Sequence, residues 1–197
     1  TTGYYDGGQV GALYTFIEHY KYNANANHYL LIGPYDHIGA QRQSSDVLQG
    51  YAIDPVARIS IQEDLRYQWF DHVLRGRRKP ALLQDRVNYQ VMGSNEWKHA
   101  PSLAAMHNTG LRLYSGTRQK AQGYQLSDKS PDGNTFIAQS VDFADRSDVD
   151  AGSPVQIIDR RLDTSNGLVF VSTPFTKATE VSGLFRGRLD FVINKRD

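Results

Sequence analysis

The sequence has 197 residues, 40% of them hydrophobic and 22% charged, which predicts one or two globular domains with ordinary cores. The net charge of +1 gives no electrostatic reason to expect nucleic acid or an anionic membrane as a partner, and no apolar run approaches the roughly 20 residues of a membrane-spanning helix. The lack of cysteine excludes disulfides, a cysteine nucleophile and thiolate metal sites, while the cellular location stays open.

The first 39 residues predict a strand, a helix and a second strand in succession. Residues 1–6 run from strand-favouring Thr and Tyr into Asp6, and the short apolar run 28–32 is closed by Gly33-Pro34, just before His37. Between them, helical spacing of apolar residues predicts a helix with one buried face, made of Val10, Leu13, Tyr14, Ile17 and Tyr20. Strand–helix–strand is the unit of a parallel α/β sheet, in which chemistry sits at the carboxyl ends of the strands. Asp6 and His37 are both expected at such an end.

An aspartate and a histidine at neighbouring strand ends suit an acid–base pair. The carboxylate fixes the imidazole tautomer through one ring nitrogen, which leaves the other free to take a proton from a nucleophile. In one class of serine hydrolases the triad follows the chain order Ser, Asp, His, so the serine is expected upstream of Thr1, and no G-x-S-x-G motif occurs in the sequence. The alternative is that Asp6 only caps a turn and that His37 is an ordinary surface histidine.

The long polar stretch 39–55 predicts a loop, either a functional lid or a solvated excursion, from which Tyr51 could line a site. Residues 59–75 predict the clearest helix, with Ser60 and Glu63 as a capping box and Gly76 as the stop signal. Its apolar stripe comprises Ile61, Leu65, Trp69, Phe70, Val73 and Leu74. Basic residues follow it, and a solvated helix end is favoured over a phosphate site for Arg75, Arg77, Arg78 and Lys79.

From Asp85 onward the apolar pattern alternates with period two, which predicts strands. After the first of them, Val87–Val91, the strand candidates are Leu111 and Leu113, then 135–137, 155–158, 168–171 and 184–193, with turn signals at 130–134 and 165–167. Such a series favours an antiparallel sandwich or jelly roll. We place the boundary near 79–85, which gives domains 1–80 and 81–197.

Acidic residues invite a calcium interpretation, but their spacing does not fit an EF-hand loop, and a solvated acidic loop is favoured for Asp142, Asp145, Asp148, Asp150 and Asp159. Four histidines show no metal spacing: His19, His72, His99 and His107. No metal site is therefore assigned.

Several motifs in order resemble those of the CocE/NonD hydrolases, the group of cocaine esterase, X-Pro dipeptidyl-peptidases and α-amino-acid ester hydrolases. Gly3-Tyr4-Tyr5-Asp6 resembles the family's G-W-Y-D, and Gly33-Pro34-Tyr35-Asp36-His37 resembles G-P-W-x-H with Tyr in place of Trp. Residues 69–76 resemble W-F-D-x-x-L-K-G, residues 91–97 resemble V-M-G-x-x-x-W, and residues 160–190 resemble the start of the C-terminal β domain. Trp97 is expected to be a packed core or interface residue.

The resemblance implies the C-terminal part of an α/β-hydrolase domain followed by a partial jelly roll, with Asp6 and His37 as the acid and base of a catalytic triad. It implies a serine hydrolase acting on small-molecule ester or amide substrates or on peptides, with no cofactor and with the serine and oxyanion hole upstream. The chain alone is then expected to be an inactive fragment, cut at both ends, that associates with the missing N-terminal part or forms a homo-oligomer. The alternative is a non-catalytic jelly-roll module that binds a saccharide or a protein partner.

One branch of the family departs from this sequence beside the aspartate. The α-amino-acid ester hydrolases resemble G-W-W-D-x-E-D, and their acidic residues help to hold the substrate ammonium. The matching positions here are Gly7, Gly8 and Gln9, none of which is charged. Little preference for substrates with a free α-amine is therefore expected.

Overall fold

The computed structural model describes the chain except residues 49, 121–122, 134, 143, 145–166 and 195–197. In chain order the elements are β1 (Thr2–Tyr5), α1 (Gln9–Tyr22), β2 (Leu30–Asp36), β3 (Val47–Leu48), β4 (Tyr51–Ala52), η1 (Pro55–Ala57), η2 (Ile61–Tyr67), α2 (Gln68–Arg75), β5 (Val87–Val91), β6 (Glu96–Ala100), η3 (Leu103–Met106), β7 (Tyr114–Lys120), β8 (Gly123–Ser127) and β9 (Phe170–Val171). The described part is a mixed α/β structure with several small sheets.

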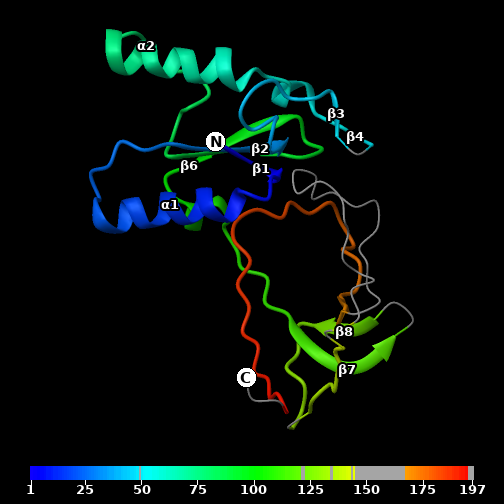
Figure 1. Cartoon of the computed structure of the whole chain (residues 1–197). Coiled ribbons are helices and arrows are strands. Elements are labelled where there is room, and N and C mark those ends of the chain that lie inside the picture. Colours follow the sequence, from blue (N-terminus) through cyan, green and yellow to red (C-terminus); the bar gives the residue numbers. More distant parts are fainter. Residues whose placement is uncertain (49, 121–122, 134, 143, 145–166, 195–197) are drawn as a thin grey trace.

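The main sheet has four strands in the order β1-β2-β5-β6, with α1 and α2 on opposite sides of it (Figure 1). β1 pairs parallel with β2, β2 pairs parallel with β5, and β6 adds an antiparallel edge. The central strand β2 is buried on both faces, because alternate side chains pack into different cores. Leu30 and Ile32 pack with Phe16 of α1, whereas Leu31 packs with Ile61 on the other side.

The helix expected over residues 10–20 is present, and its predicted buried face is correct only at Leu13 and Tyr20. Phe16 is the buried residue of α1, with Leu13 and Tyr20 packed beside it, while Val10 is 76% exposed and Tyr14 65% exposed. Phe16 was overlooked because the i, i+3, i+4 pattern from Val10 passes over it. The face that meets the sheet carries Leu13, Phe16 and Tyr20, which pack in one cluster with Leu30 and Ile32 of β2.

The second strand does not end at Gly33-Pro34, as the turn signal predicted, but continues to Asp36. The register passes from Gly3 opposite Gly33 to Tyr5 opposite Asp36, so β2 has one extra residue at this point. Such a bulge accommodates Pro34, which has no N–H to give to the ladder. The strand end that carries His37 is therefore displaced by four residues along the chain from its predicted position.

The helix predicted over residues 59–75 consists of a π-helix, η2, that continues into α2 and ends at Gly76 in the left-handed conformation (φ 65°). Ser60 caps it as expected, its Oγ accepting from the Glu63 N–H at 3.1 Å. The reciprocal bond comes from Asp64, which accepts from the Ser60 N–H at 2.9 Å, so Glu63 does not complete the capping box. The stripe is buried only in its first half, at Ile61 and Leu65, and is exposed at Phe70, Val73 and Leu74.

The C-terminal part departs further from the predicted series of strands. β7, β8 and β9 form a three-stranded sheet, with β8 antiparallel to β7 and parallel to β9. β9 lies in the predicted strand 168–171, β8 was not predicted, and β7 begins just after Leu113. Residues 135–137 and 184–193 form no strand, and 155–158 lie outside the described residues. Apolar side chains of 184–193 are largely exposed, as Phe185 (94%) and Val192 (97%) show.

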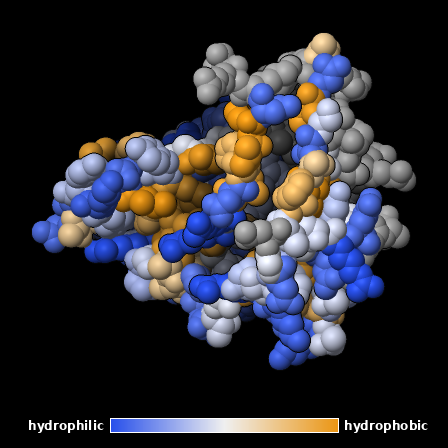
Figure 2. Space-filling view, turned by 90° about the horizontal axis from the view of Figure 1, so that it is seen from below, coloured by the Kyte–Doolittle hydropathy of each residue, from blue (hydrophilic) through white to orange (hydrophobic). Residues whose placement is uncertain are grey.

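Figure 2 shows apolar patches interleaved with hydrophilic side chains on the face of the molecule seen from below. None of the helices within the described ranges has the length and apolar character needed to cross a membrane. The boundary at residues 80 and 81 stays a prediction: β5 and β6 follow it in sequence but extend the same sheet as β1 and β2.

Candidate active site

The carboxyl ends of β1 and β2 bring Asp6 and His37 together. Tyr5 lies opposite Asp36 in the parallel register, so the next residue of each strand, Asp6 and His37, emerge side by side. The Nδ1 atom of His37 lies 2.9 Å from Oδ1 of Asp6. The contact expected from the sequence is confirmed, and it joins residues 31 positions apart.

Asp6 is held as an ionised acceptor. Its side chain is only 8% exposed, and besides His37 it accepts from the Gly8 N–H at 2.8 Å and from the Thr2 hydroxyl at 3.3 Å. Burial acts to raise the pKa of the Asp6 carboxyl, but the hydrogen bonds from His37, Gly8 and Thr2 outweigh it and the pKa lies below its usual value. Because a carboxylate can only accept, the hydrogen between the two residues is on Nδ1 of His37.

Asp36 holds the backbone after His37 through two hydrogen bonds. Asp36 Oδ1 accepts from the Gly39 N–H at 2.6 Å and the Asp36 carbonyl accepts from Ala40 at 2.9 Å, which closes a tight turn around His37. The imidazole is 48% exposed, and its Nε2 lies 2.9 Å from the side-chain nitrogen of Gln41. The ring therefore has one nitrogen fixed by a carboxylate and a second, Nε2, on its exposed side next to the Gln41 amide. A general base needs this orientation, with Nε2 as the acceptor nitrogen.

Buried residues before the pair hold the two strands close together. Tyr35 is 1% exposed and donates its hydroxyl to the Ala57 carbonyl at 3.0 Å, and burial raises its pKa. Gly3 and Gly33 face each other in the register, and a Cβ on either would meet atoms of Tyr35. Only glycine allows this approach of β1 to the bulged part of β2.

The stretch 39–55 is partly ordered into the β3–β4 hairpin rather than being entirely loop. No described contact joins Tyr51 to the Asp6–His37 pair. Its hydroxyl donates to Asp54 Oδ2 at 3.2 Å. Asp54 also accepts from the Gln90 amide at 2.6 Å and from the Gly93 N–H at 2.8 Å. Burial acts to raise the pKa of Asp54, but these donors outweigh it and the pKa is lowered. Asp54 thus fastens this stretch to the turn between β5 and β6.

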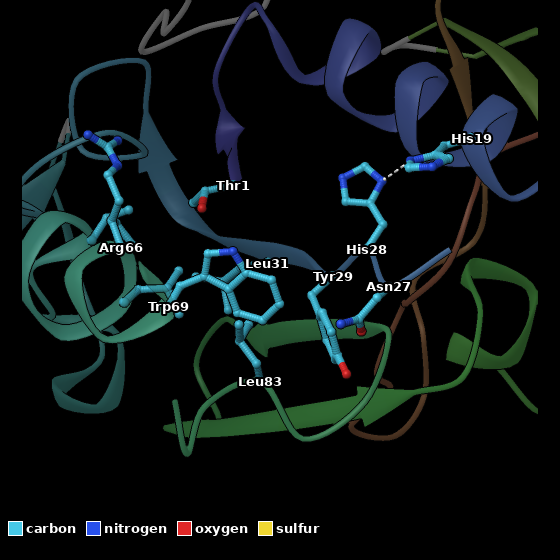
Figure 3. A pocket seen from close by; sticks show the side chains of 11 residues that line it. Thr1, His19, Asn27, His28, Tyr29, Leu31, Arg66, Trp69 and Leu83 are labelled. Atoms are coloured by element: carbon cyan, nitrogen blue, oxygen red, sulfur yellow. Dashed lines mark hydrogen bonds between the residues drawn. The ribbon is translucent and has the colours of Figure 1, made fainter. Parts of the chain in front are cut away.

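A cavity of about 360 Å³ lies at the other ends of β1 and β2 (Figure 3). Its lining includes Thr1, His28 and Tyr29, which precede these strands, together with Arg66 of η2 and Trp69 of α2. His19 and His28 are both lining residues, and their Nδ1 atoms lie 3.0 Å apart. The pKa of His28 is lowered, mainly by its burial and secondarily by the charge of His19. Since Asp6 and His37 follow the same strands, the cavity is separated from them by the length of the strands.

The remaining residues singled out in the sequence are Trp97, the basic residues at the end of α2, and the candidate metal ligands. Trp97 packs against the core and donates its indole N–H to the Val56 carbonyl at 2.8 Å, which confirms its expected packing role. Arg75 pairs with Asp71 on α2 at 2.9 Å. Within the described ranges, no three His, Cys, Asp or Glu side chains cluster as metal ligands would. Asp142 is described, but Asp145, Asp148, Asp150 and Asp159 lie outside the described residues.

Two residues at the pair were missed by sequence reasoning. Thr2 lies four residues before Asp6. Because side chains repeat every two residues along a strand, this spacing could have placed Thr2 on the same face as Asp6. Gln41 lies four residues after His37, a spacing that brings side chains together on a helical turn. Neither spacing predicts a contact with the pair unless the conformation of the turn after β2 is known.

A scan of protein families matches residues 83–197 to the family described as the X-Pro dipeptidyl-peptidase C-terminal non-catalytic domain. The match covers more than half of the chain and begins after α2, so it leaves out Asp6 and His37.

Two curated relatives match almost the whole chain. The protein named "Putative serine esterase Mb1866c" from Mycobacterium bovis and the one named "Putative serine esterase MT1883" from Mycobacterium tuberculosis are each 24% identical to it over 191 residues. These alignments cover 92% of this chain but only 28% of each relative. The chain therefore spans less than a third of the length of the relatives it matches, and the aligned region includes most of what precedes residue 83.

Proposed function

The chain belongs to the X-Pro dipeptidyl-peptidase C-terminal domain family, and from this premise we propose that it is part of a serine hydrolase that cleaves ester or amide acyl bonds. The observation that carries the proposal is the contact of His37 Nδ1 with Asp6 Oδ1 at 2.9 Å, at the carboxyl ends of adjacent parallel strands. The likeness to two proteins named as serine esterases supports the same reaction class.

In this proposal, residues 1–80 are the C-terminal part of an α/β-hydrolase domain and residues 81–197 are part of a jelly-roll domain. The parallel β1-α1-β2 unit supports the first assignment. The family match and the antiparallel β7–β8 pair support the second.

The chemistry follows from the hydrogen positions. Nδ1–H of His37 donates to Asp6, so Nε2 is the nitrogen that takes the proton from a serine hydroxyl as the serine oxygen attacks the substrate carbonyl. The imidazolium is stabilised by the Asp6 carboxylate. It then gives its proton to the leaving oxygen or nitrogen as the bond to the acyl carbon breaks, and a water attacks the acyl-enzyme by the same route in reverse.

The nucleophile in this proposal comes from outside residues 1–197, because the sequence contains no G-x-S-x-G elbow and spans 28% of its esterase-named relatives. The oxyanion hole comes with it, because the N–H next to the nucleophile is one of the usual donors. The exposed Nε2 side of His37 is where the serine would approach.

The test is steady-state hydrolysis of p-nitrophenyl butyrate by the full-length protein and its variants. His37→Ala and Asp6→Asn are expected to lower kcat by about three orders of magnitude or more, since removal of a triad member leaves only oxyanion-hole and binding catalysis. His107→Ala and Asp46→Asn serve as matched controls, because both side chains are exposed, and they are expected to retain full activity. Equal activity of all four variants would contradict the proposal.

The description of the matched family domain as non-catalytic supports a second function for residues 83–197 themselves, as a module that binds a saccharide or a protein partner. If the full-length protein has no activity that depends on His37, this alternative takes the place of the hydrolase proposal.

A further inference from the structure

The nitrogen of His37 that transfers the proton has a neighbour that the triad does not include. The side-chain nitrogen of Gln41 lies 2.9 Å from His37 Nε2. Because Nδ1 holds the ring hydrogen toward Asp6, Nε2 of the neutral ring is an acceptor, and the Gln41 amide N–H donates to it. This contact occupies the one lone pair that a serine hydroxyl would need.

The backbone that carries Gln41 is fixed, so only its side chain can yield. The Gln41 N–H donates to the Ile38 carbonyl at 3.0 Å, and the Gln41 carbonyl accepts from the Arg66 guanidinium at 3.0 Å. The next residue, Arg42, accepts from the Ile61 N–H at 2.6 Å, which ties the turn to the start of η2. Gln41 itself is exposed, so rotation about its side-chain bonds meets no packed core.

In acyl transfer the leaving group lies next to Nε2. The atom that receives the proton from Nε2 is the leaving oxygen or nitrogen, so it must come within hydrogen-bond distance of this nitrogen. When a serine and a substrate take over Nε2, an amide pivoting on the fixed Gln41 backbone remains beside the leaving group. Its N–H groups then face the first atoms beyond the scissile bond.

We propose that Gln41 is a specificity-determining residue of the leaving-group subsite, where its amide donates a hydrogen bond to an acceptor atom of the leaving group. The inference rests on the proposed hydrolase function. The amide transfers no proton itself: Nε2–H of His37 protonates the leaving oxygen, and the electron pair of the broken bond to carbon stays on that oxygen. The favoured substrates are esters or amides whose leaving group has an ether, hydroxyl or carbonyl oxygen near the scissile bond.

The experiment compares two butyrate esters in the full-length protein, 2-methoxyethyl butyrate and n-butyl butyrate, whose leaving groups have nearly the same shape and differ in one acceptor oxygen. The readout is the ratio of their kcat/KM values in each variant, since the intrinsic reactivity of each ester cancels between variants. Loss of one neutral hydrogen bond is expected to lower this ratio about threefold to tenfold in Gln41→Ala and Gln41→Leu. Gln43→Ala, which changes an exposed glutamine two residues after Gln41, is the control and is expected to leave the ratio unchanged.

A second readout is independent of turnover. Carbethoxylation of His37 Nε2 by diethyl pyrocarbonate, followed by mass spectrometry of the His37 peptide, is expected to be faster in Gln41→Ala than in wild type and in Gln43→Ala. An unchanged ester ratio in Gln41→Ala overturns the inference while the hydrolase proposal stands, provided that His37→Ala abolishes turnover of both esters. If wild type hydrolyses neither ester in a way that depends on His37, the proposed function fails, and the subsite role fails with it even if the carbethoxylation rates differ as expected.

Discussion

Replacing Gly3 by alanine tests whether the close approach of β1 to β2 sets the geometry of the Asp6–His37 pair. A Cβ at Gly3 would overlap the carbonyl oxygen of Tyr35 and lie 2.5 Å from its carbonyl carbon, where ordinary contacts are 3.4–4 Å. Both atoms belong to the backbone, so a side-chain rotation cannot relieve the clash and the strands must separate by about 1 Å. Gly3 lies three residues before Asp6, and Tyr35 two residues before His37, so the separation reaches the pair.

The expected effects follow from this displacement. Lengthening a 2.9 Å contact by about 1 Å takes it beyond hydrogen-bond range. A misplacement of this size is expected to lower kcat of the full-length protein on p-nitrophenyl butyrate by about 100-fold. Overpacking at the same position is expected to cost about 1–3 kcal/mol in the free energy of unfolding measured with urea.

Gly11→Ala is the matched control for this substitution. Gly11 lies in α1 and a Cβ there would meet nothing within 4 Å, so alanine is expected to raise stability by about 0.5–1 kcal/mol and leave kcat unchanged. If Gly3→Ala behaves like Gly11→Ala in both assays, the packing of Tyr35 against β1 does not position the pair.

Three further predictions concern activity, selectivity and acid stability. Residues 1–197 expressed alone are expected not to hydrolyse p-nitrophenyl acetate, and turnover lost in His37→Ala would show that they hold their own nucleophile. The full-length protein is expected to prefer phenylglycine methyl ester over methyl phenylacetate by less than about tenfold in kcat/KM. The reason is that Gln9 donates its amide to the Gly3 carbonyl at 3.0 Å and has no charge to offer a substrate ammonium, and a larger preference would refute this. The lowered pKa of Asp54 means that its stabilising effect is complete above its usual pKa of 3.8 and is lost as pH falls through the lower pKa of the folded state. Urea unfolding of Asp54→Asn is therefore expected to show lower stability than wild type at neutral pH, with a difference that narrows in acid; a constant difference would contradict the assignment.

The main features of the site could be predicted from the sequence because they depend on local patterns. Asp6 and His37 each follow an extended run, and parallel strands place such residues at one edge of a sheet. Ser60 and Gly76 mark the helix ends by backbone requirements that do not depend on the rest of the fold.

The rest depended on tertiary contacts that a pattern does not contain. Phe16 rather than Val10 is buried because the orientation of α1 is set by the apolar residues of β2 that it covers. The strand runs through Pro34 because a bulge accommodates a residue that usually ends pairing. Residues 184–193 have the composition of a strand but no paired neighbour in the described part of the chain, and a strand requires a partner to satisfy its backbone.

The central claim is that His37, oriented by Asp6, activates a serine outside residues 1–197. The most direct measurement is the labelling of the full-length protein by a fluorophosphonate probe, which reacts with activated serines, followed by identification of the modified peptide and the labelling rate in each variant. We predict a single modified serine outside residues 1–197, labelled about 100-fold more slowly or worse in His37→Ala and in Asp6→Asn but at the wild-type rate in His107→Ala. A modified serine within residues 1–197, or a labelling rate unaffected by His37→Ala, would contradict the account.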